Sequence, residues 1–544
     1  MSAKASLEHF SHAAACVLRG MFCKRLLEVT STQHLHMMRC VLSQYSLLQA
    51  LAFCMASTTR PWPFLLVCAL TWAMAVAEPA GCKIRITDKG LDMLKWETQK
   101  FVAEELSNIS MPEMSGKEGN FQYTVSDVKI TALNLTYADL SFSPEAGVMF
   151  DVQNSSIALS FHRQLLYWFF YDTGTIEASA EGVRINAALG LGRDTRGRLK
   201  INNVTCEAKI QRMRARFGGT LGRVYNFLGK FLTTGMRLLL NKQICPALQQ
   251  ASLLHVNSIL ESIPVRAEVD SYIGIDYALT DDPLVTSRSL DMNFRGMFFH
   301  LRDDEHDALG NYAVEPTILE YDRMVYLALS EFFFDSGLFS YYKAGIFQMN
   351  VTNDNMPKDL EMLLRTTYFG TIMMLNPALM DSPVSLEMAV NAPPKSTIKT
   401  SGATVAMTAI VKVMMMPAGQ PPVQLSSMTM ESKFNAIVFI RRKHLAVQVD
   451  LRRFKIYSNQ SALESLALLA SPWVLMCSFD VRQLIPLQAP LKTMLQMSVV
   501  PLINNWIKRG VRIPLADGMD LIEEVVEYHN GFIVIGANLH FTKA

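Results

Sequence analysis

The chain has 544 residues, of which 50% are hydrophobic and 18% are charged. This length allows several domains with large apolar cores, while the low charge and the ordinary contents of glycine (28) and proline (22) exclude a mostly disordered or collagen-like chain. The formal net charge of +2 excludes a protein that coats nucleic acid or another polyanion through bulk charge alone.

The first recognisable element is an apolar run at residues 61–77, which follows Arg60 and ends in Ala-Val-Ala. Its apolar core is too short to cross a bilayer, which needs about 20 residues. A charged start, a short apolar core and a small-residue end are typical of a secretory signal peptide, here residues 55–77. We therefore expect a secreted, extracellular protein whose mature part begins at Glu78.

Residues 1–54 precede this signal and carry scattered cysteine and histidine with little periodicity. We interpret them as an upstream extension of uncertain existence with little folded role. The alternative is that residues 41–77 act together as an uncleaved anchor.

The first half of the mature part mixes helix and strand patterns. Thr87 is expected to cap a helix that runs to about Ser107. Alternating apolar residues at 148–152 and 157–161 predict half-buried strands of antiparallel sheets. A longer amphipathic helix is predicted over about 221–242.

Positive charge is concentrated in the window 193–242, which holds twelve Lys/Arg against two acidic residues, Asp194 and Glu207, a local excess of ten. A basic window in an otherwise neutral chain indicates a local anionic partner. The alternative is a solvated face that acidic residues elsewhere balance.

Residues 303–320 are acidic at their start, lack periodicity and include Pro316, so they predict a linker. The flanking halves, 78–302 and 321–544, are similar in size and in the order of their elements. This order predicts two structurally related domains, although no short identity repeat is visible.

The second half again alternates apolar residues, at 405–413, 445–451 and 533–541, which predicts three more half-buried strands. A helix is predicted over about 490–508, with a kink at Pro501.

Four cysteines follow the signal, and four cysteines allow three complete pairings that the sequence alone does not distinguish. Secretion favours a disulfide among Cys82, Cys206, Cys245 and Cys477. Six Asn-x-Ser/Thr sequons predict surface glycosylation at Asn108, Asn134, Asn154, Asn203, Asn350 and Asn459.

Motifs for catalysis are absent from the sequence: there is no GxxxxGK[ST], GxGxxG, HExxH or GxSxG. The histidines are scattered, and no His or Cys pair after the signal has the spacing of metal ligands. We therefore expect neither an enzyme nor a metal or cofactor site.

Several segments resemble the family of bactericidal/permeability-increasing protein, lipopolysaccharide-binding protein, phospholipid transfer protein and cholesteryl ester transfer protein. They are the segment Ile84-Arg-Ile-Thr-Asp-Lys-Gly-Leu-Asp, the stretch that starts at Asp322-Arg-Met-Val-Tyr-Leu-Ala-Leu-Ser and the tail from Gly531. The likeness spans about 82–542.

The resemblance implies an α+β fold shaped as a two-domain boomerang. Each half would be a strongly twisted antiparallel β-barrel with a long amphipathic helix, and a central sheet would join the halves. The resemblance also implies a Cys206–Cys245 disulfide in the first barrel, which leaves Cys82 and Cys477 free and buried.

The resemblance further implies an apolar pocket for phospholipid acyl chains in each barrel. Each buried methylene contributes about 0.8 kcal/mol, so two chains would supply ample affinity. The alternative for each candidate side chain is plain core packing. The expected lining residues are Leu91, Leu94, Phe101, Val224, Phe227, Leu228, Phe231 and Leu232.

Two further surfaces are expected to contact lipid. Lys209, Arg212, Arg214 and Arg216 lie along a predicted strand, where they would bind anionic head groups. Where relatives carry a Lys-rich turn, this chain has an aromatic segment, and Leu165, Trp168 and Phe170 are expected to form a membrane-contacting tip. The alternative is that these three pack inward on a strand.

The leading hypothesis is therefore a secreted, non-enzymatic protein that holds phospholipid or lipopolysaccharide acyl chains, with a role in innate defence. The first alternative is a lipid transfer protein that shuttles lipid between particles. The second is a module with filled pockets that binds a receptor or another partner. The expected partners are a lipid and a membrane or lipoprotein surface, with no nucleic acid, and we expect a monomer.

Overall fold

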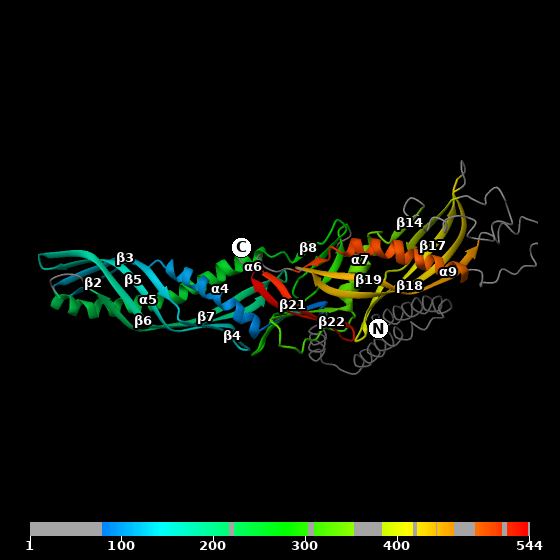
Figure 1. Cartoon of the computed structure of the whole chain (residues 1–544). Helices are drawn as coiled ribbons and strands as arrows, with labels where there is room; N and C mark the ends of the chain where they lie inside the picture. Colours follow the sequence, from blue (N-terminus) through cyan, green and yellow to red (C-terminus); the bar gives the residue numbers. More distant parts are fainter. Residues whose placement is uncertain are drawn as a thin grey trace, which may run out of the picture. The chain divides into compact units, whose positions relative to one another are not determined.

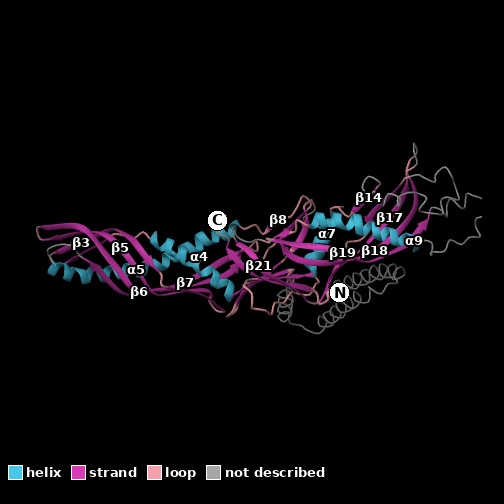
Figure 2. Cartoon of the chain, in the orientation of Figure 1, coloured by secondary structure: helices cyan, strands magenta, loops and turns pink. Residues whose placement is uncertain are grey.

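The computed structural model describes residues 79–216, 222–302, 309–352, 383–416, 421–441, 443–461, 485–513 and 519–541. These residues belong to one compact unit, Ala77–Ala544, in which long strands predominate and a few helices lie against them (Figures 1 and 2). The predicted extension, the signal peptide, Cys477 and residues 303–308 of the predicted linker lie outside the described residues.

The first half is built on a curled antiparallel sheet with the strand order β2-β3-β5-β6-β7, and β4 pairs with β5. Its longest strand has 24 residues, which corresponds to about 80 Å at about 3.3 Å per residue. Register shifts interrupt the pairing near Asp127 and Asn154, two non-glycine residues with positive φ, and such bulges bend strands. The strands are β2 (Met114–Glu118), β3 (Phe121–Asn134), β4 (Tyr137–Ser143), β5 (Gly147–Tyr167), β6 (Phe170–Arg193) and β7 (Leu199–Arg216).

Two helices pack on this sheet. The helix α4 (Asp88–Ser107) begins directly after Thr87, as expected, but the Thr87 hydroxyl donates to the Arg323 carbonyl (2.7 Å) rather than capping the helix. The helix α5 (Gly222–Gln250) is longer than expected, and a π-helical segment (Ala251–Val256) and α6 (Asn257–Ser262) continue it.

The second half repeats this plan with a sheet in the order β14-β15-β17-β18-β19-β20, with β16 paired to β17. The helix α7 (Glu331–Lys343) precedes this sheet, and α9 (Ile485–Met494), a π-helical segment (Leu495–Val499) and α10 (Val500–Ile507) follow it. The strands are β14 (Gln348–Val351), β15 (Val384–Val390), β16 (Lys395–Lys399), β17 (Gly402–Met415), β18 (Val423–Arg441), β19 (His444–Ser461) and β20 (Val511–Arg512).

In each half, an asparagine side chain forms hydrogen bonds with the backbone of a long strand. Asn257 of α6 accepts from the Ile201 N–H (2.8 Å) and donates to the Ile201 carbonyl (3.0 Å). Asn504 of α10 makes the same pair of bonds with Val449 of β19, at 2.8 and 2.9 Å. The shared device, beside a π-helical segment in each half, agrees with the prediction of two related halves.

A central sheet takes strands from both halves, in the order β10-β11-β1-β13-β22-β21. Strand β1 (Cys82–Thr87) pairs with β11 on one side and β13 on the other, and β13 pairs with β22. The other strands are β10 (Leu284–Val285), β11 (Ser289–Phe294), β13 (Val325–Ser330), β21 (Met519–Tyr528) and β22 (Phe532–Phe541), and a small separate sheet holds β8 (Arg266–Glu268), β9 (Ile273–Asp276) and β12 (Met297–His300). The predicted α+β class with a joining sheet is confirmed, whereas the domain boundaries stay a prediction because this sheet draws on both sides of them.

A buried ion pair fixes the central sheet to the segment that precedes β13. Arg85 of β1 donates two hydrogen bonds to Asp291 of β11 (2.6 and 2.7 Å) and one to the Ile318 carbonyl (2.9 Å). The Arg85 guanidinium also lies 4.6 Å from the centre of the Tyr321 ring. Ile318, in the predicted linker, and Tyr321, which directly follows it, are therefore both in contact with Arg85 of the sheet.

Candidate functional site

The interior of the first half is apolar and is formed by α4, α5 and the concave face of the sheet. Of the predicted lining residues, Leu91 and Leu232 are buried, and Leu94 and Phe101 are half-buried against the same cluster. The structure thus brings these four together. The side chains of the other four, Val224, Phe227, Leu228 and Phe231, lie outside the described part of α5.

The helix α5 presents its buried face at regular intervals. Leu232, Met236, Leu240, Ile244 and Leu248 recur every four residues, and each has at most 4% of its surface exposed. This spacing places them on one side of the helix, toward the sheet. The buried face continues past Pro246, because Leu248, in the last turn of α5, is also buried in the core.

One charged side chain lies on the buried side of the sheet in this half. Arg163 of β5 follows the buried Phe161 and precedes the buried Leu165, and its side chain is only 6% exposed. Its guanidinium donates to Asp172 of β6 (2.7 Å). A buried guanidinium requires such a counter-charge, so this pair joins β5 to β6 near their hairpin.

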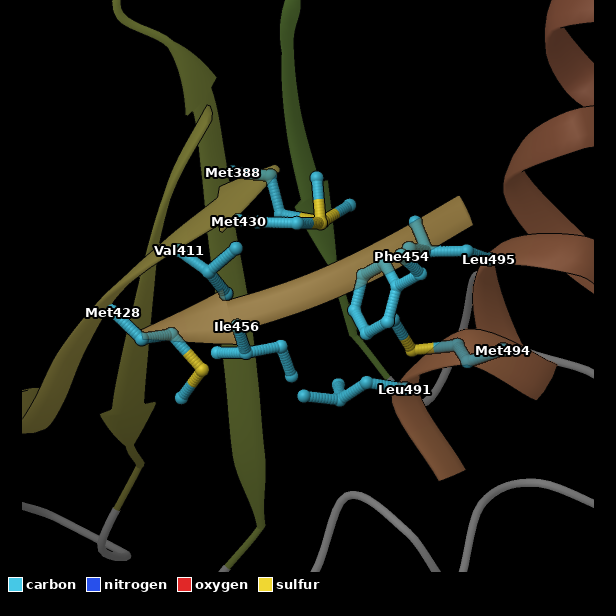
Figure 3. A pocket seen from close by; sticks show the side chains of 9 residues that line it. All are labelled: Met388, Val411, Met428, Met430, Phe454, Ile456, Leu491, Met494 and Leu495. Atoms are coloured by element: carbon cyan, nitrogen blue, oxygen red, sulfur yellow. The ribbon is translucent and has the colours of Figure 1, made fainter. Parts of the chain in front are cut away.

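The second half contains a small apolar cavity, and none of its lining residues was among those predicted from the sequence. Strands β15, β17, β18 and β19 and the helix α9 surround it (Figure 3), and four of its nine lining side chains are methionines. It leaves about 10 Å³ of space, close to the volume that one water-sized probe occupies. The lining residues are Met388, Val411, Met428, Met430, Phe454, Ile456, Leu491, Met494 and Leu495.

Methionine lining matters because the side chain is unbranched and rotates about three bonds. The apolar wall can therefore change shape at a lower cost than a wall of β-branched residues. The alternation of Met428 and Met430 on β18 was the available sequence signal, but the other lining residues come from five separate elements. Their meeting could not be read from local pattern.

The turn between β5 and β6 exposes a continuous aromatic segment, which we call the aromatic tip and define as residues 166–171. Its exposed fractions are 64% for Trp168, 97% for Phe169 and 53% for Phe170. Trp168 has a φ of 55°, a left-handed conformation that a bulky residue rarely adopts. Leu165, which was expected at this surface, is instead 5% exposed and packs in the core.

The predicted basic residues lie on β7, the strand at the edge of the first sheet. Lys209, Arg212, Arg214 and Arg216 are all exposed, and we call the last three the arginine row. Across the ladder, Arg212 is opposite Glu181 and Arg216 is opposite Glu177. Glu181 also lies 3.5 Å from Arg214, so acidic neighbours offset part of the positive charge of the row.

The disulfide implied by the resemblance is present. Cys206 of β7 is bonded to Cys245 of α5, with a sequence separation of 39 residues and a Cα–Cα distance of 5.5 Å. In the chain-entropy description, closing a loop of this length stabilises the fold by about 4 kcal/mol. Cys82 is free and buried, and burial raises the pKa of its thiol to about 12, which keeps it protonated at neutral pH.

Five of the six predicted glycosylation sites are exposed: Asn108, Asn134, Asn154, Asn203 and Asn350. The side chain of Asn459 lies outside the described residues. Exposure makes these sequons accessible, while glycosylation itself stays a prediction.

Among the described residues, no helix combines the length and apolar character needed to cross a bilayer. In the same part of the chain, three potential metal-ligand atoms, from Glu320, Glu527 and His529, lie within 4.8 Å of one another. Glu320 is about 200 residues away from Glu527 and His529, so sequence spacing could not reveal the group.

Comparison with known families gives matches over most of the chain. The model for the N-terminal domain of the LBP / BPI / CETP family matches residues 90–262, and the model for its C-terminal domain matches residues 267–541. A solved structure with the same fold is that of lipopolysaccharide binding protein. It has a TM-score of 0.59 and 21% identity, and the match covers 86% of this chain and all of that one.

Curated relatives include a phospholipid transfer protein of Homo sapiens. It is 52% identical over 471 residues, which cover 87% of this chain and 92% of the relative. The Homo sapiens BPI fold-containing family C protein is 22% identical over 501 residues, covering 89% and 94%. This identity is lower than the 52% of the phospholipid transfer protein.

Proposed function

Because the chain belongs to the LBP / BPI / CETP family, we propose that it is a secreted, non-enzymatic protein that binds phospholipid and carries it between lipid surfaces. Lipid holding and lipid transfer were the two leading hypotheses from the sequence. The 52% identity to a protein named for phospholipid transfer favours transfer over holding alone.

The observation that carries this proposal is the aromatic tip. A lipid carrier must make contact with the particle from which it takes its cargo, and large aromatic side chains are suited to the boundary between water and lipid. Soluble proteins seldom expose such a contiguous apolar surface unless it contacts a partner or a membrane. Trp168 and Phe169 are exposed where two long strands end, so they can reach a surface before the body of the sheet does.

The interior of each half supplies the chemistry for holding acyl chains. Apolar side chains from helix and sheet exclude water, and each methylene transferred from water to such surroundings contributes about 0.8 kcal/mol. The cavity beside α9 is smaller than an acyl chain, so binding requires its methionine side chains to move aside. Their flexible thioethers support this movement.

A second candidate function is the capture of an anionic lipid such as lipopolysaccharide. The fold match to lipopolysaccharide binding protein and the exposed arginine row favour it. The facing carboxylates of Glu177 and Glu181 reduce the net charge of this surface, which is why we place capture second. The arginine row would contact phosphate groups through charge-assisted hydrogen bonds.

Two measurements on the protein secreted from mammalian cells test the proposal. Native mass spectrometry should show co-purified phospholipid, and the protein should accelerate exchange of a fluorescent phospholipid between donor and acceptor vesicles. Bound lipid without exchange would support holding alone. Absence of both would refute the carrier and leave the module with filled pockets.

The same preparation tests the proposed secretion signal. N-terminal sequencing of the secreted product should begin at Glu78. A product that begins upstream of residue 55 would show that the extension is retained, and a product confined to membranes would support the uncleaved anchor.

A further inference from the structure

A second hollow is lined mainly by charged side chains. It has a volume of about 730 Å³ and is formed by the turn that follows β6, the start of β8, the end of β9 and the residue after β11. Four arginines line it, Arg193, Arg196, Arg266 and Arg295, against the three aspartates Asp194, Asp276 and Asp282. We call this hollow the arginine cleft.

The three aspartates direct oxygen atoms toward donors of the protein. Asp276 is only 5% exposed, and its Oδ1 accepts from the Ala278 N–H at 2.8 Å. Asp194 Oδ1 accepts from the Arg196 and Arg198 N–H groups, both at 2.8 Å. Backbone donors at these distances offset part of the negative charge within the cleft.

Asp276 also holds two guanidinium groups next to each other. Its Oδ2 lies 3.4 Å from Arg266 Nε and 3.2 Å from Arg295 Nη1. The Arg266 guanidinium also lies 4.6 Å from the centre of the Phe299 ring. Each of these two arginine side chains is 43% exposed, so it is anchored on one side and accessible on the other.

We propose that the arginine cleft binds a phosphate group, with Arg266 and Arg295 as its anchored pair and the exposed Arg196 at its entrance. A planar guanidinium group can donate two parallel hydrogen bonds to a pair of phosphate oxygens, and it stays charged at every physiological pH. The volume admits a phosphate with an attached polar group. The phosphate belongs either to the head group of a phospholipid or to a small soluble phosphate ester, and the head-group source rests on the proposed carrier function.

Isothermal titration at low salt tests this inference with two probes, inorganic phosphate and glycerophosphocholine, which is a phospholipid head group without acyl chains. We expect both to bind, and the double variant Arg196→Gln/Arg266→Gln to weaken binding at least tenfold. The matched control, Arg452→Gln/Arg453→Gln, removes the same charge from two exposed positions of β19 and should change the dissociation constant less than twofold. No heat from either probe, or an equal loss in the control, overturns the proposal.

A third variant separates orientation from net charge. Asp276→Asn makes the cleft more positive by one charge, so charge alone predicts tighter binding. If Asp276 orients the arginine pair, binding should weaken instead, and tighter binding would refute the anchored pair. If Asp276→Asn does not fold, the double variant still tests whether the arginines of the cleft bind phosphate.

The two probes also distinguish the source of the phosphate. Tighter binding of glycerophosphocholine indicates a lipid head group, whereas tighter binding of inorganic phosphate indicates a soluble ester. Vesicle exchange by the double variant is a separate readout. Exchange that stays normal while phosphate binding is lost removes the head-group source without affecting the proposed carrier function.

Discussion

Replacement of Trp168 by alanine should weaken the association of the protein with phospholipid vesicles. An aromatic side chain buries about 150–250 Å² when it is fully covered. Since 64% of Trp168 is exposed, about 100–160 Å² is available to a lipid surface. At about 25 cal/mol per Å², full coverage is worth about 2.5–4 kcal/mol.

If the tip enters the lipid only partly, about half of that surface is covered, so the expected loss is about 1.2–2 kcal/mol, or about 8–30-fold in the partition coefficient. Co-sedimentation with zwitterionic vesicles measures this coefficient directly. Residues 166–171 carry no charge, so the effect should persist at high salt.

Trp96 provides the matched control, because it is 69% exposed but lies on α4. Trp96→Ala should leave vesicle partitioning within about twofold of the wild type. Circular dichroism should show both variants folded, since neither ring contributes to a core. Equal losses in the two variants, or no loss at Trp168, would refute the assignment of the aromatic tip as the contact surface.

Three other predictions follow from charged groups. Replacing all three residues of the arginine row with alanine should weaken binding to anionic vesicles at low salt, and the loss should be much smaller at 1 M salt. Unchanged binding at low salt would show that the row does not contact anionic lipid. In a urea titration, Asp291→Asn should lower the free energy of unfolding by about 3–5 kcal/mol, because it leaves the Arg85 guanidinium buried without its counter-charge. The control Asp139→Asn removes one partner of an exposed ion pair and should lower it by less than about 1 kcal/mol. Burial raises the pKa of Asp335, so the stability that this group contributes is present at low pH and is lost as the pH rises through the raised pKa. The free energy of unfolding of Asp335→Asn, relative to that of the wild type, should therefore increase with pH above about 4. A difference that stays constant with pH would contradict this prediction.

The sequence predicted best the features that depend on local periodicity. The helix that starts after Thr87 was located to within a residue, because its apolar spacing and its polar ends agree. The helix α5 was expected to end at Lys242 but continues to Gln250. Tertiary packing explains the difference, since Ile244 and Leu248 are buried in the core on both sides of Pro246, and that burial offsets the cost of proline in a helix.

Features that depend on contacts between distant segments of the chain were harder to predict from the sequence. Leu165 and Trp168 were expected on one surface, but Leu165 points into the core while Trp168 lies in the turn. The pairing partners of β7, which place Glu177 and Glu181 opposite the arginine row, follow from strand register rather than local pattern. The arginine cleft joins residues as far apart as Arg193 and Arg295, so only the folded chain brings its guanidinium groups together.

The position of β1 means that the central sheet can form only after much of the chain has been synthesised. This strand leaves the ribosome early, yet one of its neighbours, β13, begins at Val325. Until some 240 further residues have been made, its unpaired edge is open to the wrong neighbour, and such edges recruit other chains. A nascent chain interrupted before residue 325 would therefore retain an unpaired strand edge and would be prone to associate with other chains.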